Sequence, residues 1–440
     1  MSHARTSNKA LLVLSFGGPN KADDIIPFLE NVTRGRGIPR ERLAEVGEHY
    51  YKLGGKSPIN EQNLSLIANI ASELSKRNLT LPIYFGNRNW EPYVEDVLQS
   101  ITRDGITEVY VFVTSAWGGY SGCAQYNEDI QRALQSVKDS GLHPPKTIRL
   151  PHFHNHPAFI AEFAHAVDEA RQELPRELQE TADLVFTAHS VPTAADAKAG
   201  PGSFGGNLYS QQVLDSSRLV QEASSFAGCP GTAADISWTG KLARNENVGG
   251  RGVGPANTGD TIGIDVGSDT AHTVELVWQS RSGSPHTPWL EPDICDHIAA
   301  RAKAGNKRPI VLCPIGFVTD HVEVMWDLDT EAKDTAKEHG IPLVRVATPG
   351  LSTAFASMVV DLAAERGAFG NTVRVTNQYE SQEPLGMRGS CRTHKVYPGP
   401  KHTAASSNQD TACAIIKNFS TVPNFGCTTN GESCEPGCCS

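Results

Sequence analysis

The stretch RPIVLCPIGFVTDHVEVMWDLDTE, residues 308–331, joins an apolar run to a concentration of metal-capable side chains. The apolar run, rich in β-forming residues, predicts a buried strand. If the residues that follow are helical, Glu323, Asp327 and Glu331 recur every four residues and stack on one face. Such a stripe is repulsive unless a cation or a general-base role compensates it. With His321 it predicts a path for a divalent ion, whereas an acidic first turn that complements the helix dipole is the simpler alternative.

The pattern of a strand followed by a polar loop recurs along the chain. Apolar, β-rich runs lie at residues 10–16, 81–85, 108–114, 146–150, 182–187, 274–278, 309–314 and 342–346. Stretches with helical periodicity separate most of them, so the fold class is predicted to be α/β, with parallel sheets flanked by helices. Ligands of open α/β sheets bind outside the carboxyl ends of the strands, so the polar loops are expected to face one cleft.

Length and charge narrow the possible functions. A chain of 440 residues is long enough for two domains, or for one large domain with insertions. The net charge is −10 and the basic residues are dispersed, which argues against a nucleic-acid partner. The N-terminus does not resemble a signal peptide, and no apolar run reaches the roughly 20 residues of a transmembrane helix. We therefore expect a soluble, cytoplasmic protein with no transmembrane segment.

Two segments interrupt the α/β pattern. Residues from about 229 to 272, rich in Gly, Asn and Thr, are interpreted as an insertion, and residues 367–440 as a polar tail. Six of the ten cysteines lie in the last 50 residues: Cys391, Cys413, Cys427, Cys434, Cys438 and Cys439. In a reducing cytoplasm such a cluster indicates metal or iron-sulfur ligands rather than disulfides.

Polar groups at other strand ends suggest a binding site. His189 ends an apolar strand just before a proline-fixed turn, where an imidazole suits proton abstraction or metal ligation, although a lone histidine is more often structural. Arg34 and Arg36 lie in a Gly-punctuated loop and can bind carboxylates in bidentate geometry, unless the loop is simply solvated. Aromatic residues such as Phe16 and Trp90 can wall a flat apolar ligand or can belong to the core.

Together these segments resemble the ferrochelatases, and among them the actinobacterial enzymes that insert ferrous iron into coproporphyrin III. The resemblance covers about residues 10–226 and 274–366. It rests on LLVLSFGGP, FLENVTRGRGIP, GGKSPINEQN, YFGNRNWEPY, TSAWGGYSGCAQYNEDI, FTAHSVPT, WQSRSG with PWLEPDI, and PIGFVTDHVEVMWDLD. So many motifs in the family order make the resemblance specific.

The resemblance implies two Rossmann-like domains, at residues 8–180 and 181–366, with a porphyrin cleft between them. It implies that His189 and Glu323 bind the ferrous iron, and that Ser57 and Tyr126 contact the macrocycle. The expected reaction is insertion of Fe²⁺ into coproporphyrin III to give coproheme in haem biosynthesis. A haem-pathway enzyme that accepts coproheme is then a possible partner.

The carboxylates and the tail extend this interpretation. Asp327 and Glu331 are expected to form the outer part of the iron path. The tail spacing of Cys427, Cys434, Cys438 and Cys439 resembles the C-terminal cluster that holds a two-iron, two-sulfur (2Fe-2S) centre in several ferrochelatases. Such a centre takes four thiolates. Because Cys438 and Cys439 are adjacent, Cys229 is a candidate for one ligand, while a zinc site or an unmetallated tail is the alternative.

The chain departs from the family pattern in places. Many relatives outside the actinobacterial group carry Tyr where this chain has Phe16, and phenylalanine cannot ligate iron. The insertion and the long tail are also expected to be unusual. The alternatives are a protoporphyrin IX ferrochelatase, a chelatase that inserts cobalt into a sirohydrochlorin, and a non-catalytic haem-binding or iron-sulfur protein of the same fold. The motifs argue against the sirohydrochlorin branch, and the presence of His189 and Glu323 argues against a non-catalytic protein.

Overall fold

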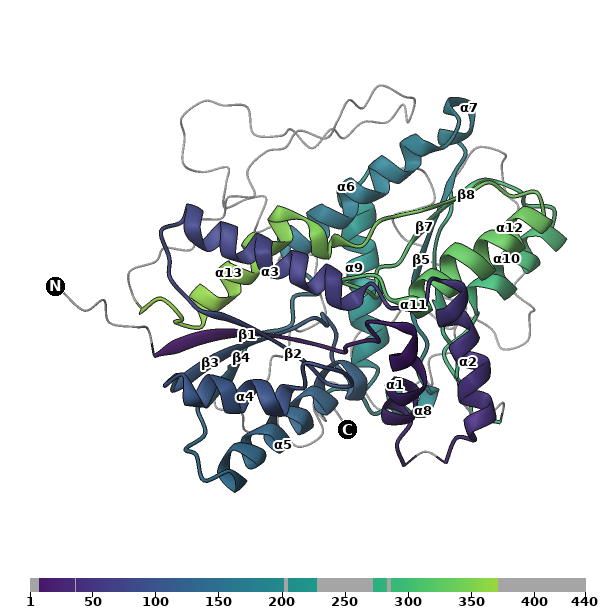
Figure 1. Ribbon diagram of the computed structural model, residues 1–440. Coiled ribbons are helices and arrows are strands. Elements are labelled where there is room, and N and C mark those ends of the chain that lie inside the picture. The colour runs from purple at the N-terminus through teal and green to yellow at the C-terminus, as the bar shows by residue number, and fades with distance from the viewer. Residues whose placement is uncertain (1–7, 36, 202–204, 228–271, 283–285, 371–440) are drawn as a thin grey trace, which may run out of the picture.

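A computed structural model describes residues 8–35, 37–201, 205–227, 272–282 and 286–370. Its centre is formed by two four-stranded parallel sheets, in the strand orders β2-β1-β3-β4 and β6-β5-β7-β8 (Figure 1). The strands are β1 (Lys9–Ser15), β2 (Ile83–Asn87), β3 (Glu108–Val113), β4 (Lys146–Arg149), β5 (Asp183–His189), β6 (Val274–Gln279), β7 (Ile310–Cys313) and β8 (Leu343–Arg345). The α/β fold class is confirmed, and each predicted strand run contains an observed strand.

Helices connect the strands and cover the sheets. Those that follow β1 to β4 are η1 (Ala22–Asp24), α1 (Ile25–Val32), α2 (Arg40–Lys52), α3 (Ile59–Lys76), α4 (Val94–Arg103), η2 (Tyr120–Ala124), α5 (Gln125–Asp139), α6 (Pro157–Glu173) and α7 (Arg176–Gln179). Those that follow β5 to β8 are α8 (Thr193–Asp196), α9 (Leu208–Ala223), α10 (Ile294–Lys303), α11 (Val322–Val324), η3 (Met325–Ala332), α12 (Lys333–Glu338), η4 (Pro349–Leu351) and α13 (Thr353–Glu365).

Strand β1 shows why these runs form central strands. Successive side chains of a strand point to opposite faces of the sheet, so a strand covered on both faces is apolar throughout. Leu11 and Val13 pack into one hydrophobic core, whereas Leu12 and Leu14 pack into a second core with residues of α4 and α5. All four side chains are fully or almost fully buried.

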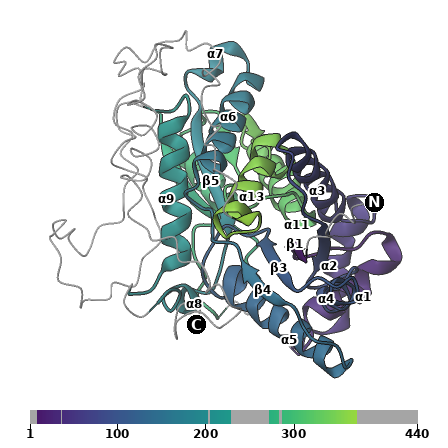
Figure 2. The same ribbon diagram turned by 90° about the vertical axis from the view of Figure 1, so that its left-hand side faces the viewer.

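The two sheets share a hydrophobic core. The core that includes Phe112 of the first sheet also includes Phe186 and Trp278 of the second. Helices α6 and α9 run side by side along this core (Figure 2). The last described helix, α13, returns to the first half, where its Asp361 Oδ1 lies 2.6 Å from Nη1 of Arg77, the residue directly after α3. Extensive apolar packing and a largely buried ion pair therefore hold the halves together.

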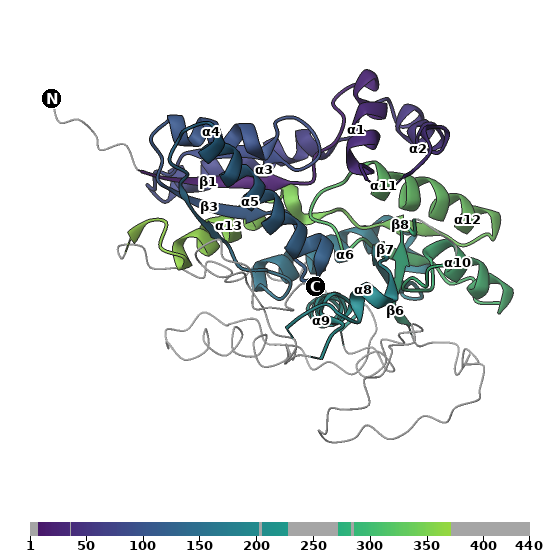
Figure 3. The same ribbon diagram turned by 90° about the horizontal axis from the view of Figure 1, so that it is seen from below.

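The halves also meet at the carboxyl ends of their strands. Trp117, after β3, donates a hydrogen bond from Nε1 to the carbonyl oxygen of Gly316, after β7, at 2.9 Å. The hairpin of α1 and α2 lies beside α11 of the second half (Figures 1 and 3). Val322 of α11 packs there into a cluster with Phe28 and Tyr50. The two sets of strand ends thus face a common region, as the sheet rule predicts.

Candidate functional site

His189 and Glu323 come together at the strand ends of the second sheet. His189 is the last residue of β5, and Glu323 lies in the short α11 that follows β7, the strand next to β5. His189 Nε2 lies 3.7 Å from Glu323 Oε2, and the two side chains are 38% and 52% exposed. The pair is therefore accessible to a ligand, and it joins a nitrogen and an oxygen donor at one point.

Backbone contacts orient the imidazole of His189. Its Nδ1 lies 2.5 Å from the carbonyl oxygen of Ser190, so Nδ1 carries the proton that is donated to that carbonyl. Nε2 then presents its lone pair toward Glu323. The hydroxyl of the part-buried Tyr209 donates to the carbonyl oxygen of His189 at 2.8 Å and fixes the strand end. The geometry suits an imidazole that accepts a proton or binds a metal ion through Nε2.

The carboxylates after β7 lie on a helix of a different kind from the predicted one. The expected α-helix is limited to α11, and residues Met325–Ala332 form the π-helix η3 before α12 begins. A π-helix bonds each residue to the fifth one along and has a wider turn, so residues four apart do not complete a turn. The expected α-helix was therefore wrong beyond α11, but residues four apart fall only slightly short of a full π-turn, so the three carboxylates stay near one face and influence one another.

Asp327 occupies the most enclosed position of the three. Its Oδ2 accepts hydrogen bonds from the Ser280 hydroxyl and, at 3.4 Å, from Gln279 Nε2, both at the end of β6. Burial raises the pKa of Asp327 to about 7, and the negative charges of Glu323 and Glu331 add to the effect, while the Ser280 hydrogen bond opposes it. A carboxyl group that is part protonated at neutral pH can release its proton to water when a cation approaches.

Glu331 lies at the outer end of the π-helix and is exposed. Its Oε1 accepts a hydrogen bond of 2.8 Å from Nε1 of Trp326. His321, in contrast, packs its ring edge to face on Phe317, and burial lowers the pKa of its imidazole. The structure therefore places Glu323 beside His189, Asp327 beside the end of β6 and Glu331 at the protein surface.

The strand ends of the first sheet carry aromatic rings and arginines. Phe16, directly after β1, is 39% exposed and packs edge to face on Phe28. The guanidinium of Arg88, after β2, lies 4.5 Å from the ring centre of the buried Tyr126. Trp90 also packs edge to face on Phe28 and is part buried, so of these aromatic residues Phe16 offers the most exposed ring to a ligand.

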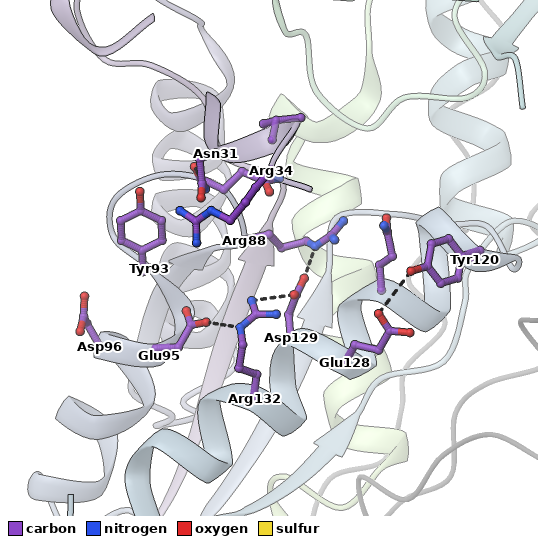
Figure 4. Close-up of a pocket in the computed structure, with 13 residues that line it drawn as sticks. Asn31, Arg34, Arg88, Tyr93, Glu95, Asp96, Tyr120, Glu128, Asp129 and Arg132 are labelled. Carbon is purple, nitrogen blue, oxygen red and sulfur yellow. Dashed lines mark hydrogen bonds and ion pairs between the residues drawn. The ribbon is translucent and has the colours of Figure 1, made fainter. Parts of the chain in front are cut away.

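A polar cavity of about 940 Å³ adjoins these rings. Arg34, Arg88 and Arg132 line it together with Glu95 and Asp129 (Figure 4). Asp129 pairs with Nε of Arg88 and, at 2.7 Å, with Nη2 of Arg132, and Glu95 lies 2.7 Å from Nε of Arg132. Arg34 has no such ion pair with any residue that the structure describes. Its guanidinium is the cation of this cavity best placed to bind an anionic group from solution.

Ser57 is buried near this region. Its side chain is packed against Gly18, where an added Cβ would lie 2.7 Å from Cβ of Ser57, so Gly18 admits no larger residue. Its Oγ lies 3.5 Å from the backbone nitrogen of Ile59 at the start of α3. Ser57 therefore holds the loop after β1 against α3, and only 4% of its surface is exposed.

Several predicted site residues lie outside the described residues. They are Arg36, Cys229, Cys427, Cys434, Cys438 and Cys439, together with most of the 229–272 insertion and of the 367–440 tail. Within the described ranges, no three His, Cys, Asp or Glu side chains are grouped as metal ligands. Burial raises the pKa of Cys295 to about 12 and that of Cys313 well above its ordinary value, so these two thiols stay protonated.

Sequence reasoning missed Arg88, Asp129 and Ser280 as parts of the site. Arg88 and Ser280 each follow a strand directly, in loops that the strand-end rule directs toward the cleft, but that rule does not single out one residue of a loop. Asp129 lies in the second turn of α5, and no local pattern distinguishes it from other helical carboxylates. It meets Arg88 because α5 packs along one face of the first sheet.

Comparison with known proteins identifies the family of this chain. A family profile described as ferrochelatase matches residues 8–367. The chain belongs to the ferrochelatase family. The paired imidazole and carboxylate, and the acidic π-helix, are therefore features of a ferrochelatase, with the metal ion as its substrate.

Three curated relatives carry the name coproporphyrin III ferrochelatase. The Nocardia farcinica protein is 42% identical over 98% of this chain and 96% of its own length. The Mycobacterium sp. (strain JLS) protein is 46% identical over 81% of this chain and 87% of its own length. The Streptomyces coelicolor protein is 44% identical over 81% of this chain and 85% of its own length. The solved structure of Bacillus subtilis SirB with Fe³⁺ gives a TM-score of 0.42 at 13% identity, over 81% of this chain and 96% of that chain.

The alignment with the Nocardia protein extends into the 367–440 tail. Because it extends over 98% of this ferrochelatase, most of the 367–440 tail has a counterpart in that relative. The length of the tail is therefore not peculiar to this chain.

No described helix is long and apolar enough to cross a membrane.

Proposed function

We propose that this ferrochelatase inserts Fe²⁺ into coproporphyrin III and releases coproheme and two protons, as a step of haem biosynthesis. The observation that carries the proposal is the 3.7 Å approach of His189 Nε2 to Glu323 Oε2 at exposed strand ends. The names of the relatives, at 42% to 46% identity, support the choice of porphyrin. The roles below are assigned on the same basis.

His189 accepts the pyrrole protons in this proposal. Metal insertion requires the two inner N–H groups of the macrocycle to lose their protons. An imidazole with a lone pair on Nε2 is a suitable base near neutral pH, and the carbonyl of Ser190 keeps the proton of the neutral ring on Nδ1. The carboxylate of Glu323, 3.7 Å from Nε2, stabilises the imidazolium that forms when His189 takes up a proton.

The carboxylates deliver the iron. A hydrated Fe²⁺ ion loses water most easily when oxygen ligands replace it stepwise. Glu331 at the surface, Asp327 beside β6 and Glu323 next to His189 form such a series from outside to inside. Asp327, with its pKa of about 7, is part protonated until a cation approaches, so the innermost region does not carry the full repulsion of three negative charges.

The first half of the chain holds the macrocycle. Coproporphyrin has four propionates, and the guanidinium of Arg34 lines a polar cavity beside the aromatic strand ends. We assign Arg34 and Arg36 to propionate recognition, and Phe16, Trp90, Tyr126 and Ser57 to the cleft wall around the ring. Rigid walls that favour a bent ring help insertion, because a bent ring turns its nitrogen lone pairs toward the incoming metal.

The domain division and the cellular location complete the proposal. We place the domain boundary at residues 180 and 181, between the two sheets, although α13 packs on the first half. The cytoplasm is the proposed location, since both substrates are water-soluble and no described helix can cross a membrane.

A 2Fe-2S centre in the tail is also proposed, on the spacing of Cys427, Cys434, Cys438 and Cys439. Thiolates are the donors that such a centre takes, so the donor set is chemically suitable. Because Cys438 and Cys439 are adjacent, Cys229 is the proposed ligand from the body of the chain. Acid-labile sulfide in the purified protein, lost in Cys434→Ser, tests the centre, and one equivalent of zinc without sulfide contradicts it.

The activity is tested by anaerobic Fe²⁺ insertion, followed by absorbance, with coproporphyrin III and protoporphyrin IX in parallel. We expect turnover with coproporphyrin to exceed turnover with protoporphyrin. The reverse order would favour the protoporphyrin alternative. Tight haem binding without turnover on either porphyrin would favour a non-catalytic binding protein.

A further inference from the structure

Trp326 connects the two halves of the chain at the outer end of the carboxylate series. Its indole ring, on η3 of the second half, is stacked on the imidazole of His49, on α2 of the first half, with ring centres 3.9 Å apart and an angle of 7° between the planes. Nζ of Lys52, one turn further along α2, lies 5.3 Å from the same indole. Two side chains of one helix therefore fix the position of this ring.

The same indole holds Glu331. Its Nε1 donates a hydrogen bond of 2.8 Å to Oε1 of the carboxylate, which leaves Oε2 to take a cation. Glu331 is exposed, and a glutamate side chain on a surface ordinarily samples many rotamers. A carboxylate that is already held in place loses less conformational entropy when it binds a cation.

The contact between α2 and η3 is supported by packing beneath it. Val322, at the start of α11, belongs to the apolar cluster that includes Leu43 and Tyr50 of α2. Close to it, the backbone N–H of Asp320 donates a 2.7 Å hydrogen bond to the side chain of Gln62, on α3 of the first half. The stack of His49 on Trp326 is thus accompanied by apolar packing between α2 and α11, which lie side by side (Figure 3).

We infer that Trp326 is a positioning residue for iron uptake: it orients Glu331 as the first carboxylate to meet Fe²⁺, and His49 of the other half keeps Trp326 in place. The inference rests on the proposed function, because it assumes that Glu331 takes part in iron entry. Neither Trp326 nor His49 contacts the reacting atoms. Their effect therefore falls on the capture of iron and leaves the insertion step unchanged.

The substitution Trp326→Phe tests the hydrogen bond separately from the stack, because phenylalanine keeps an aromatic ring over His49 but has no N–H. We expect it to raise the apparent KM for Fe²⁺ roughly fivefold, while kcat stays within about twofold of wild type. Glu331→Gln is expected to raise the same KM. In the double variant the two effects are expected not to multiply, because Trp326 acts only through the carboxylate charge of Glu331, which Glu331→Gln already removes.

His49→Ala is expected to raise the KM for Fe²⁺ by a smaller factor of about two, since it removes a stacking contact and leaves the hydrogen bond. His165→Ala, an exposed histidine of α6, is the matched control and is expected to leave both constants unchanged. An unchanged KM for Fe²⁺ in Trp326→Phe, or effects of Trp326→Phe and Glu331→Gln that multiply, would overturn the inference. Circular dichroism checks that each variant is folded.

A second measurement does not depend on turnover. Co²⁺ alone, titrated into the full chain without porphyrin, quenches the fluorescence of nearby tryptophans. We expect the wild type to lose a component of emission that Trp326→Phe lacks, with a midpoint that moves to higher Co²⁺ concentration in Glu331→Gln. Identical titrations of the wild type and Trp326→Phe would contradict the inference. If the wild type inserted no iron, the proposed function would fail, while this titration would still decide whether Trp326 and Glu331 are coupled.

Discussion

The two sheets of this ferrochelatase have the same order of strands, but the side chains at their strand ends differ in kind. In each, the first strand of the sheet lies between the second and the third, and the fourth lies at the edge. The strands of the first sheet end at arginines and aromatic rings, with Arg88 over Tyr126 and Arg34 in a polar cavity. Those of the second sheet end at His189, Ser280 and a series of carboxylates.

The difference shows that the arrangement of the strands decides where a site lies and that the side chains at the strand ends decide what it does. A parallel sheet exposes its loops at one edge whatever their sequence. The first set of loops suits a flat ligand with negative groups, and the second suits a cation and its protons. A chelatase needs a site for the porphyrin and a site for the metal ion. The hydrophobic core that the two sheets share holds their two sets of strand ends toward each other.

The largest effect is expected from removing the base of the second sheet. His189→Ala should lower kcat by roughly 100- to 10,000-fold, the usual contribution of a general base. The KM for coproporphyrin should change little, because the arginines and rings of the first sheet remain. Steady-state kinetics measures both, with His165→Ala as control, and near wild-type turnover would remove His189 from the proposed mechanism.

A smaller effect should distinguish the inner from the outer carboxylates. Glu323→Gln should reduce kcat/KM for Fe²⁺ about tenfold more than Glu331→Gln does, because Glu323 alone of the two approaches Nε2 of His189. Both are glutamate-to-glutamine changes on the same segment, so each is the matched control of the other. Equal losses would mean that the carboxylates do not form an ordered path.

The first sheet should show the converse kinetic pattern. Arg34→Ala should raise the KM for coproporphyrin about tenfold and leave kcat nearly unchanged, since a charged hydrogen bond to a propionate is made in the ground state and the transition state alike. Arg103→Ala, an exposed arginine of α4, is the control. A fall in kcat without a change in KM would assign Arg34 to the reaction instead of to binding.

The smallest effect concerns stability and pH. Because burial raises the pKa of Asp327 to about 7, the folded protein keeps a proton that the unfolded chain loses near its ordinary pKa of about 4. The folded state binds more protons in this window, so the contribution of Asp327 to stability is lost as pH rises from about 4 to about 7. Asp327→Asn, which does not titrate, should therefore be the more stable protein at pH 8.

Melting temperatures of the metal-free wild type and Asp327→Asn, measured from pH 5 to pH 8.5, test this prediction. We expect the difference in unfolding free energy between them to grow by roughly 3 kcal/mol from pH 5 to about pH 7, at about 1.4 kcal/mol per pH unit, and then to level off. Curves that run parallel across the whole range would show that Asp327 keeps its ordinary pKa.

The sequence by itself determined where the eight strands lie and which polar residues lie at or near their carboxyl ends. Hydrophobic periodicity is local, so an apolar run such as residues 10–16 predicts a buried strand without knowledge of its neighbours. It also placed Glu323, Asp327 and Glu331 in one segment. Only the tertiary structure decided that η3 is a π-helix and that burial beside Ser280 raises the pKa of Asp327.

The tertiary structure also decided which distant residues meet. His189 faces Glu323 because β5 pairs with β7, and His49 stacks on Trp326 because the α1–α2 hairpin packs over α11. Arg88 pairs with Asp129 because α5 packs along one face of the first sheet. Such contacts join segments far apart in the chain, and they depend on how whole elements pack, which no local pattern of residues records.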